Sequence, residues 1–403
     1  MYLIATHIPI HTDGIRYYTD ISWQRDLILA RDWLARPYGG LTLIAPSAPL
    51  QAIDTEGMAL VPIGYDDGIR VVPSFDVRGR ARHFWLRDRH IWNLDIQREL
   101  AGASVFHTSA CDVFRPFTFM AHSAAVQAGV PTVFVGPDMD VHALLPRTAR
   151  GRLHCLIYDF WTKRALSRAK LGLLKEGLVH DRYHRFGRNV KAMCHSMHSD
   201  TDVIPIEQLE QRLQTLGSGR PLRIVYAGRF VARKGLQHAL GTIAFARKNG
   251  ISVEFHLYGA GPEESMLRTQ ATTLDILSSV FFHGIVEYGP AFIRTLGDFD
   301  VFLFMPTEED SPRALFDAMA AGLPIVGTRI PFLNTRVAND RQGILVDIGD
   351  MQGAANQLAY LNSNLEIFRT LSRNARIAGV RHSVNEWYRL RREWTHEICN
   401  PAT

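Results

Sequence analysis

An acidic stretch that runs into a helix start is the most informative chemical pattern in the sequence. Residues 307–324 read Thr-Glu-Glu-Asp-Ser-Pro-Arg-Ala-Leu-Phe-Asp-Ala-Met-Ala-Ala-Gly-Leu-Pro. Ser311 is a favourable N-cap and Pro312 a favourable first helical residue, and the closing Gly-Leu-Pro predicts the helix end. Free N–H groups at such a start can bind a phosphate, while nearby carboxylates can accept hydrogen bonds from sugar or ribose hydroxyls. A solvent-exposed acidic loop is the alternative.

A second pattern is basic. Residues 226–235 read Tyr-Ala-Gly-Arg-Phe-Val-Ala-Arg-Lys-Gly and follow an apolar run. Arg229 and Lys234 are therefore expected at the carboxyl end of a strand, where two cations could neutralise a diphosphate and stabilise it as a leaving group. An ordinary basic surface loop is the alternative.

Two further motifs carry less weight. Gly259-Ala260-Gly261-Pro262 predicts a tight strand-to-helix turn, but Glu264 stands where a dinucleotide fingerprint has its third glycine. Asp138-Met139-Asp140 is a short acidic DxD motif, a pattern that can bind a metal ion. We expect no metal site here, because Arg229 and Lys234 already supply positive charge.

These patterns need strands that bring them to one edge of a sheet. The second half of the chain alternates short apolar runs with longer segments of helical period, which predicts parallel strands buried on both faces. The first half carries fainter signals of the same kind. We expect an α/β protein with two doubly wound domains and ligands at the carboxyl ends of the strands. The expected strands are Leu3–His7, Leu41–Ala45, Ser104–His107, Pro131–Gly136, Arg223–Ala227, Val253–Tyr258, Val280–His283, Val301–Phe304, Pro324–Gly327 and Gly343–Val346.

The domain boundaries follow from polar segments. The polar stretch Gln208 to Arg220 is the expected linker, which divides the chain into an N-terminal domain at 1–205 and a C-terminal domain at 206–380. Ser383-Val384-Asn385-Glu386 is a capping-box pattern, so 381–403 is expected to form a terminal helix that packs back towards the N-terminal domain. Its expected buried stripe is Trp387, Leu390, Trp394 and Ile398.

In this order and spacing, the motifs resemble the C-terminal domain of the retaining GT-B glycosyltransferases of the group 1 family (family 4 of glycosyltransferases). The resemblance covers about residues 220–350. It is carried by Gly228-Arg229 with Lys234-Gly235, by Gly259-Ala260-Gly261-Pro262, by His283-Gly284 and by Glu309 with Asp317 in a Glu-x7-Glu pattern. It implies a GT-B fold, in which two Rossmann-like domains face each other across a cleft, with the acceptor bound by the first domain and the nucleotide sugar by the second.

The resemblance also implies roles for single residues. Arg229 and Lys234 would hold the donor diphosphate, and Glu309 would contact the donor sugar; these three are the expected catalytic residues. Asp317 stands at the ribose-binding Glu and is one methylene shorter, and Asp310 replaces a residue that is usually small. The other expected donor-binding residues are Gly14, Gly228, Gly261, His283, Gly284, Ser311, Pro312, Arg313 and Ala314.

The N-terminal half matches the family less well. The expected first loop, His11-Thr12-Asp13-Gly14, has one glycine where many members have several. Pro137-Asp138 keeps the Asp of a common His-Asp pair and loses the His. His107 is expected to end a strand and point towards the cleft. We therefore assign His107 and Asp138 to the acceptor side, with a purely structural histidine as the alternative for His107.

The implied reaction moves a hexose-type sugar from a nucleoside diphosphate to a hydroxyl of a glycan or lipid-linked acceptor, in bacterial exopolysaccharide, capsule or lipopolysaccharide synthesis. The leaving phosphate helps to take the acceptor proton, so no strong protein base, metal or cofactor is expected. Two alternatives keep the fold: a nucleotide-sugar epimerase or phosphorylase, and a binding protein without turnover. The base and sugar of the donor, the acceptor and the oligomeric state are not encoded in recognisable residues.

Composition narrows the setting. The chain has 403 residues, 46% of them hydrophobic, and its four cysteines have no CxxC spacing, which favours a reducing cytosol and argues against a disulfide scaffold. No secretion signal or membrane span is expected. The net charge of +5 is small, but residues 147–191 hold 12 Lys and Arg against three acidic residues. We expect this segment to contact an anionic membrane at the inner face of the cytoplasmic membrane, with a solvated helix face as the alternative; no nucleic-acid module accompanies it.

Overall fold

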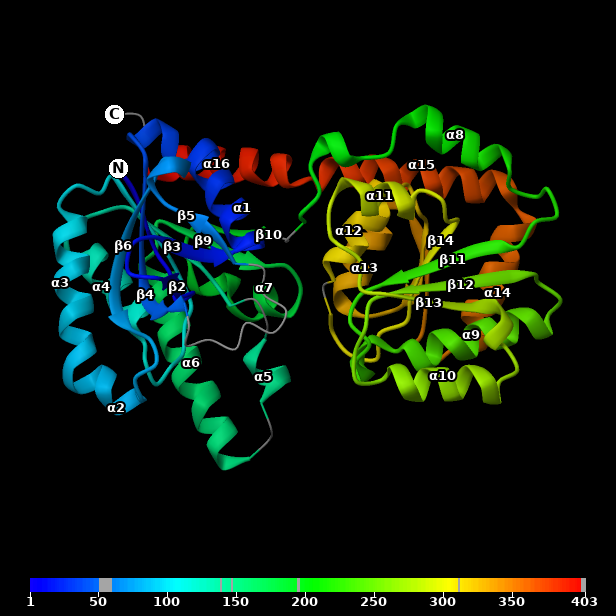
Figure 1. The fold of residues 1–403 in the computed structure, drawn as a ribbon, viewed down its shortest axis with the longest axis horizontal. Coiled ribbons are helices and arrows are strands. Elements are labelled where there is room, and N and C mark those ends of the chain that lie inside the picture. Colours follow the sequence, from blue (N-terminus) through cyan, green and yellow to red (C-terminus); the bar gives the residue numbers. More distant parts are fainter. Residues whose placement is uncertain (51–59, 138–139, 146–147, 194–195, 311, 400–403) are drawn as a thin grey trace. The chain divides into compact units, whose positions relative to one another are not determined.

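The chain folds into two compact units, each with its own sheet (Figure 1). The computed structural model describes residues 1–50, 60–137, 140–145, 148–193, 196–310 and 312–399. Unit 1 contains Met1–Cys194 together with Tyr388–Thr403, and unit 2 contains His195–Trp387.

The sheet of unit 2 contains six parallel strands in the order β13-β12-β11-β14-β15-β16. Counted along the chain, this order is 3-2-1-4-5-6, the doubly wound arrangement in which the strand order reverses between β11 and β14. The expected strands of the second half are confirmed to within one residue at each end. They are β11 (Leu222–Ala227), β12 (Val253–Tyr258), β13 (Val280–Gly284), β14 (Val301–Phe304), β15 (Ile325–Thr328) and β16 (Gly343–Val346).

Helices cover both faces of this sheet, as Figure 1 shows. Because β14 and β15 are fully buried, every residue in them is apolar or small enough to pack against helices on either side. The helices of unit 2 are α8 (Ile206–Gln214), α9 (Leu236–Lys248), α10 (Glu264–Thr273), α11 (Pro290–Leu296), α12 (Arg313–Ala320), α13 (Pro331–Asp340), α14 (Met351–Ser363) and α15 (Leu365–Arg381).

The sheet of unit 1 is larger and mixed. Among the described residues its order is β10-β9-β8-β7-β1-β4-β2-β3-β5, with β6 paired to β4. Most neighbours are parallel, but β3 is antiparallel to both β2 and β5. The strands are β1 (Tyr2–Ala5), β2 (Ile10–Thr12), β3 (Tyr17–Asp20), β4 (Leu41–Pro49), β5 (Leu60–Ile63), β6 (Ile69–Asp76), β7 (Val105–Ser109), β8 (Thr132–Val135), β9 (Leu171–Lys175) and β10 (Val190–Met193).

The core of unit 1 is aromatic. Trp92 is fully buried and its indole N–H donates to the carbonyl of Phe117 at 2.9 Å, while the Phe75 and Phe84 rings pack around the pair. The helices of unit 1 are α1 (Ile21–Leu29), α2 (Ala81–His83), α3 (Arg89–Leu100), α4 (Phe117–Gln127), α5 (Val141–Leu144), α6 (Ala149–Arg168), α7 (Leu178–Tyr183) and most of α16 (Val384–Cys399).

The expected linker differs from the structure. Residues that we expected to be a linker begin inside α8, whose Leu209 and Leu213 side chains are buried in unit 2. Arg212, also buried, donates to the carbonyls of Gly297, Ala321 and Gly322. The hydrophilic residues predicted a linker because, in the sequence, a buried arginine that caps three carbonyls cannot be told from a solvated one. The units instead divide at 194/195 and at 387/388.

The terminal helix begins at Val384, with the backbone N–H of Glu386 donating to the hydroxyl of Ser383 at 3.2 Å, which confirms the cap. Its buried line is shifted by one residue from the expected stripe. Tyr388, Thr395 and Cys399 are buried, whereas Trp387 and Trp394 are half-buried. Tyr388 anchors the helix in unit 1 by donating to the backbone carbonyl of Asp26 at 2.9 Å.

Candidate functional site in unit 2

The loops that follow β11 and β14 lie next to each other at the topological switch of unit 2. The loop after β11 carries Arg229 and Lys234, and the loop after β14 carries Glu309 and Asp310. A parallel doubly wound sheet binds ligands in this crevice, outside the carboxyl ends of its strands. The structure thus brings the basic and the acidic patterns of the sequence together.

Backbone contacts fix these two loops against one another. Gly235 has φ +66°, and a Cβ added to it would lie 1.7 Å from the carbonyl oxygen of Met305. Two residues on, the backbone N–H of Thr307 donates to the carbonyl of Arg233 at 3.1 Å. Only glycine fits at 235, because any side chain would separate the loops.

The turn after β12 is packed just as closely on the β11 loop. A Cβ at Gly259 would lie 2.0 Å from the carbonyl oxygen of Gly228, and one at Gly261 would lie 2.3 Å from that of Phe230. The N–H of Gly228 donates to the backbone carbonyl of Tyr258, and the N–H of Gly259 donates to the carbonyl of Gly284 at 2.7 Å. These glycines therefore bring the loops after β11, β12 and β13 into backbone contact, which confirms the tight turn expected at 259–262.

Lys234 is the buried cation of the site. It ends a short 3-10 turn at Ala232–Lys234 and is 8% exposed, with its ammonium group paired to Asp310 and 5.5 Å from the centre of the Phe304 ring. Burial lowers the pKa of Lys234, and the neighbouring Asp310 carboxylate opposes that shift. Arg233 pairs with the same carboxylate at 3.3 Å. A buried ammonium needs such a counter-charge, so Asp310 neutralises Lys234 in this structure.

Arg229 is different, because its side chain is exposed. Among the described residues it has no hydrogen-bond or ion-pair partner. Its backbone is held instead, since its carbonyl accepts a hydrogen bond from the Tyr226 hydroxyl at 3.1 Å. Arg229 is thus a solvated cation on a fixed loop, available to an anionic ligand.

Glu309 reaches the start of α13. Its carboxylate accepts a hydrogen bond from the backbone N–H of Phe332 at 3.4 Å, in the first turn of that helix. A carboxylate is stable there because the helix dipole and the free N–H groups favour negative charge. Glu309 is half-buried, so the contact orients the group without removing it from solvent.

Asp317 is buried on α12, with 3% of the residue exposed. Its carboxylate accepts a hydrogen bond from the Tyr288 hydroxyl at 3.0 Å, and one ring nitrogen of the buried His198 lies 3.8 Å away. The other nitrogen of His198 donates to the carbonyl of Gly379 at 2.7 Å. The Asp317 carboxylate is therefore hydrogen-bonded to Tyr288 in this structure. The ribose-binding role of Asp317 stays a prediction.

The helix start differs slightly from the expectation. α12 begins at Arg313, and Pro312 occupies the N-cap position instead of the first helical position. Ser311, expected as the N-cap, lies outside the described residues. Arg313 is exposed beside the sulfur of Met197, and Ala314 is half-buried. The expected helix end is confirmed, since Gly322 has φ +64° just after the C-cap.

His283 lies on β13 in a stack of rings. One of its nitrogens is 2.9 Å from a ring nitrogen of His256, and its ring centre is 4.4 Å from that of Tyr258. Burial lowers the pKa of both histidines. Gly284 follows at φ +74° and uses its carbonyl to hold the Gly259 turn. Whether His283 binds donor stays a prediction.

The three candidates in the first half lie in unit 1. Gly14 occupies the turn between β2 and β3, with φ +94° and an exposed backbone. This corrects the expected loop: His11 and Thr12 belong to β2, which pairs with β4. His107 lies inside β7, not at its end, and is 7% exposed, with the Tyr2 hydroxyl 3.1 Å from its ring.

Asp138 and Met139 lie outside the described residues. Asp140 is described, and it caps α5 through the N–H of His142 at 3.1 Å and pairs with Arg182 at 2.9 Å. It therefore has a structural place in unit 1.

Two participants in the site, Arg233 and Tyr288, were missed from the sequence, as was the role of Asp310. Arg233 and Asp310 form the charge cluster around Lys234, and Tyr288 holds Asp317. The adjacency of Arg233 to Lys234 was visible, but its partner was not. Tyr288 could have been suspected from its place just before the Gly289-Pro290 helix start, at the carboxyl side of β13.

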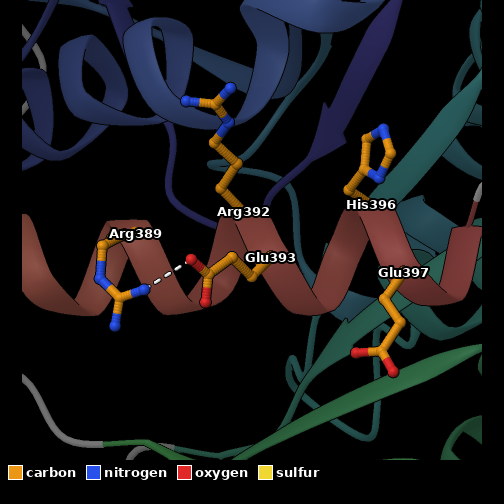
Figure 2. Close-up of a pocket in the computed structure, with 5 residues that line it drawn as sticks. All are labelled: Arg389, Arg392, Glu393, His396 and Glu397. Atoms are coloured by element: carbon orange, nitrogen blue, oxygen red, sulfur yellow. Dashed lines mark hydrogen bonds and ion pairs between the residues drawn. The ribbon is translucent and has the colours of Figure 1, made fainter.

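A separate hollow of about 570 Å³ lies along α16, away from the residues of the switch point in sequence (Figure 2). Its lining is Arg389, Arg392, Glu393, His396 and Glu397, and Arg389 and Glu393 pair with one another. These five residues, the part of the lining that the structure describes, all lie on α16. Across the described parts of the chain, no helix has both the length and the apolar character to cross a membrane.

Comparison with known proteins identifies the segment that carries the site. Residues 221–364 match the family model described as glycosyl transferases group 1. That segment, about a third of the chain, is similar to the group 1 glycosyltransferases. It contains Arg229, Lys234, Glu309 and Asp317, which confirms the resemblance on which their assignment rests.

Relatives in surface polysaccharide synthesis match over part of their length. The chain is 30% identical over 151 residues to the putative colanic acid biosynthesis glycosyltransferase WcaL of Escherichia coli, covering 34% of this chain and 36% of WcaL. It is 30% identical over 135 residues to the lipopolysaccharide core biosynthesis glycosyltransferase LpsE of Rhizobium meliloti, covering 34% and 38%. The matched part thus spans little more than a third of these relatives.

The fold likeness extends over the whole chain. The crystal structure of HepE of Anabaena, solved in complex with UDP, aligns with a TM-score of 0.67 at 15% identity and covers 98% of each chain. With two α/β units, one on a parallel sheet and one on a largely parallel sheet, the protein has the GT-B fold. The group 1 segment is the part whose sequence, as well as fold, is shared.

Proposed function

We propose that the protein is a retaining glycosyltransferase that moves a hexose-type sugar from a nucleoside diphosphate sugar to a hydroxyl of a glycan or lipid-linked acceptor. The observation that carries the proposal is the pair of cations after β11, Arg229 and the buried Lys234, beside the acidic loop after β14. They lie at the switch point of a segment that matches the group 1 family.

The hard step is to break the bond between the anomeric carbon and the diphosphate. As that bond breaks, negative charge grows on the leaving phosphate, and fixed cations in a partly dry site lower the energy of this charge. Arg229 and Lys234 would take this role. The new bond forms between the anomeric carbon and the acceptor oxygen, and the acceptor proton passes to the departing phosphate oxygen, so that nucleoside diphosphate is released.

Asp310 gives this mechanism a specific feature. It pairs with Lys234 and Arg233 in the structure, so a donor diphosphate would compete with it for both cations. Exchange of one anion for another keeps the buried ammonium neutralised throughout. Glu309 would accept a hydrogen bond from a sugar hydroxyl. Asp317 would bind the ribose once its hydrogen bond to Tyr288 is broken.

Two protein cations at the diphosphate support a reaction that needs neither metal nor cofactor. The relatives named for colanic acid and lipopolysaccharide core synthesis support an acceptor of surface-polysaccharide type and a place at the cytoplasmic face of the membrane.

The first test is donor binding. We expect one of the UDP-, GDP-, ADP- or TDP-sugars to raise the melting temperature, because a ligand at roughly 100 times its Kd adds about 2.7 kcal/mol to the free energy of unfolding. Arg229→Ala should abolish this shift without lowering the basal melting temperature, since the side chain is exposed. Lys248→Ala is the matched control, because Lys248 is an exposed cation at the opposite end of α9.

The second test is the reaction. With acceptor present, we expect nucleoside diphosphate release and a product whose anomeric configuration equals that of the donor, read by NMR. Conversion of the donor sugar without acceptor would indicate an epimerase instead. A clear thermal shift with no turnover on any glycan or polyprenyl-linked acceptor would indicate a binding protein.

A further inference from the structure

The long helix α6 carries an exposed apolar ridge. Leu153, Leu156 and Phe160 are 57%, 65% and 57% exposed, and their spacing of three and four residues places them on one side of the helix. In Figure 1 the amino-terminal half of α6 extends beyond the strands of unit 1. A helix on a water-soluble surface normally buries such a stripe.

The ridge is not the face by which α6 packs on its own unit. Tyr158, Thr162, Ala165 and Leu166 are buried and lie on the opposite side of the helix, where Tyr158 contacts the Phe119 ring. Packing in unit 1 is therefore complete without the ridge. Three large exposed apolar side chains in one row need another explanation.

Positive charge borders the ridge on both sides. At 100° per residue, Arg150 and Arg164 fall on one flank and Arg152 on the other, and all three are exposed. The acidic residue of α6, Asp159, lies on the same flank as Arg152, but its side chain is only 16% exposed and is engaged by Lys163, His142 and Tyr183. The exposed side of α6 thus combines apolar and basic groups and carries no unpaired carboxylate.

Aromatic side chains continue the surface next to α6. The Phe114 ring, 44% exposed, meets the His154 ring of α6 with centres 5.3 Å apart. Trp85, in the short π-helical turn Phe84–Asp88, is 43% exposed and donates its indole N–H to the carbonyl of Phe114 at 3.0 Å. Arg89 lies over that indole ring. Trp beside Arg is a combination that suits a membrane–water interface.

We propose that this α6 ridge docks the protein on the surface of an anionic lipid bilayer. The three apolar side chains would enter the headgroup region, and the flanking arginines would meet anionic headgroups. The charge decides the occupant: an apolar ridge with cations on both flanks and no exposed acid complements an anionic surface. Docking by this ridge is independent of the proposed reaction, because no residue of the donor site takes part.

The structure also narrows the basic segment expected at 147–191. Several of its cations are used inside unit 1: Arg182 pairs with Asp140, and Lys191 lies over the Trp394 ring. The segment continues through β9, α7 and β10, so it does not form one continuous surface. Within it, α6 supplies the ridge that joins exposed arginines to exposed apolar side chains.

The test is cosedimentation with phosphatidylcholine vesicles, with and without phosphatidylglycerol. We expect binding only when phosphatidylglycerol is present, and weaker binding as salt rises. Leu156→Glu/Phe160→Glu should reduce the partition coefficient at least tenfold. Arg150→Gln/Arg152→Gln/Arg164→Gln should reduce it on the order of 100-fold at low salt, since each basic residue contributes roughly fivefold.

Ile377→Glu/Val380→Glu is the matched control, because it places the same two charges at half-exposed aliphatic positions on α15 in unit 2, and it should bind vesicles as the wild type does. Each variant should keep its melting temperature and its shift with nucleotide sugar, which separates this proposal from the proposed function. Wild-type protein that ignores anionic vesicles, or ridge variants that bind unchanged, would overturn it. So would self-association that Leu156→Glu/Phe160→Glu abolishes without vesicle binding by the wild type, which would assign the ridge to a second copy.

Discussion

The two units differ in how their ligand-side loops are held. In unit 2 the loops after β11, β12 and β14 touch backbone to backbone, and Gly235, Gly259 and Gly261 each approach a carbonyl oxygen so closely that no Cβ fits. In unit 1 a Cβ added to Gly14 would have no other atom within 4 Å, and Gly14 lies in the turn of the antiparallel β2–β3 hairpin.

This difference bears on the family match, which covers residues 221–364 of unit 2. A loop fixed by backbone contact accepts few residue types, so its sequence pattern persists. A loop that is exposed to solvent tolerates many residue types. The matched segment 221–364 lies in unit 2, the unit with the backbone-fixed loops.

The largest expected effect comes from removing the buried cation of unit 2. Lys234→Ala should reduce kcat by a factor on the order of 100 to 1000, as loss of one electrostatic contact to a developing charge does. Because the change leaves Asp310 without its ammonium partner, Lys234→Ala/Asp310→Ala separates catalysis from stability. Turnover of either variant near the wild-type rate would remove Lys234 from the reaction.

A glycine substitution tests the comparison directly. Gly235→Ala should lower the free energy of unfolding of unit 2 by about 3 kcal/mol, because the methyl group meets the Met305 carbonyl at a left-handed φ. Gly14→Ala in unit 1 has the same backbone handicap without the collision, so about 1 kcal/mol is expected. Urea unfolding followed separately for each unit measures both, and equal losses would contradict the contrast.

Acid should act on unit 1 first. Burial lowers the pKa of His107 to about 3 and that of His122 to about 4, from an unfolded value of 6.5. Below pH 6.5 these two histidines are protonated in the unfolded chain but stay neutral in the folded unit. The free energy of unfolding of unit 1 therefore falls as the pH drops towards the pKa values of the folded state. Each ring contributes about 1.4 kcal/mol per pH unit in that window.

The check is the urea midpoint of each unit between pH 7 and pH 4. His107→Gln/His122→Gln should flatten the profile of unit 1. In unit 2 the lowered pKa values of His256 and His283 belong to less buried rings, so its decline should be shallower. An identical pH profile in the wild type and the double variant would refute the assignment.

The smallest effect is expected at Tyr288. Tyr288→Phe removes the hydrogen bond to Asp317 and should lower the free energy of unfolding of unit 2 by about 1 kcal/mol, with unit 1 unchanged. If ribose takes the place of the tyrosine hydroxyl, the variant should bind the nucleotide at least as tightly as the wild type, by calorimetry. Clearly weaker binding would mean that Tyr288 itself contacts the ligand.

Prediction from sequence succeeded where periodicity and turn chemistry agree. The six strands of unit 2 and the helix ending at Gly322 were readable because continuous apolar runs and glycine punctuation decide them locally. The short strands at Ile10–Thr12 and Tyr17–Asp20 were not, since they depend on pairing with β4 and β5 far along the chain. Long-range partners also explain why two contacts in the site were not predicted. Asp310 lies 76 residues beyond Lys234, and no residue near Asp317 in the sequence indicates its contact with Tyr288.

The split membership of α16 has a consequence for biosynthesis. Unit 2 is continuous in sequence, whereas unit 1 includes Tyr388 and the rest of the terminal helix, which hydrogen-bonds to Asp26 of α1. During synthesis the ribosome completes unit 2 before it adds the terminal helix of unit 1. Unit 2 can therefore finish folding on the nascent chain while unit 1 still lacks that helix. Domains usually fold in the order of synthesis. Here the closing helix of unit 1 is synthesised only after the whole of unit 2.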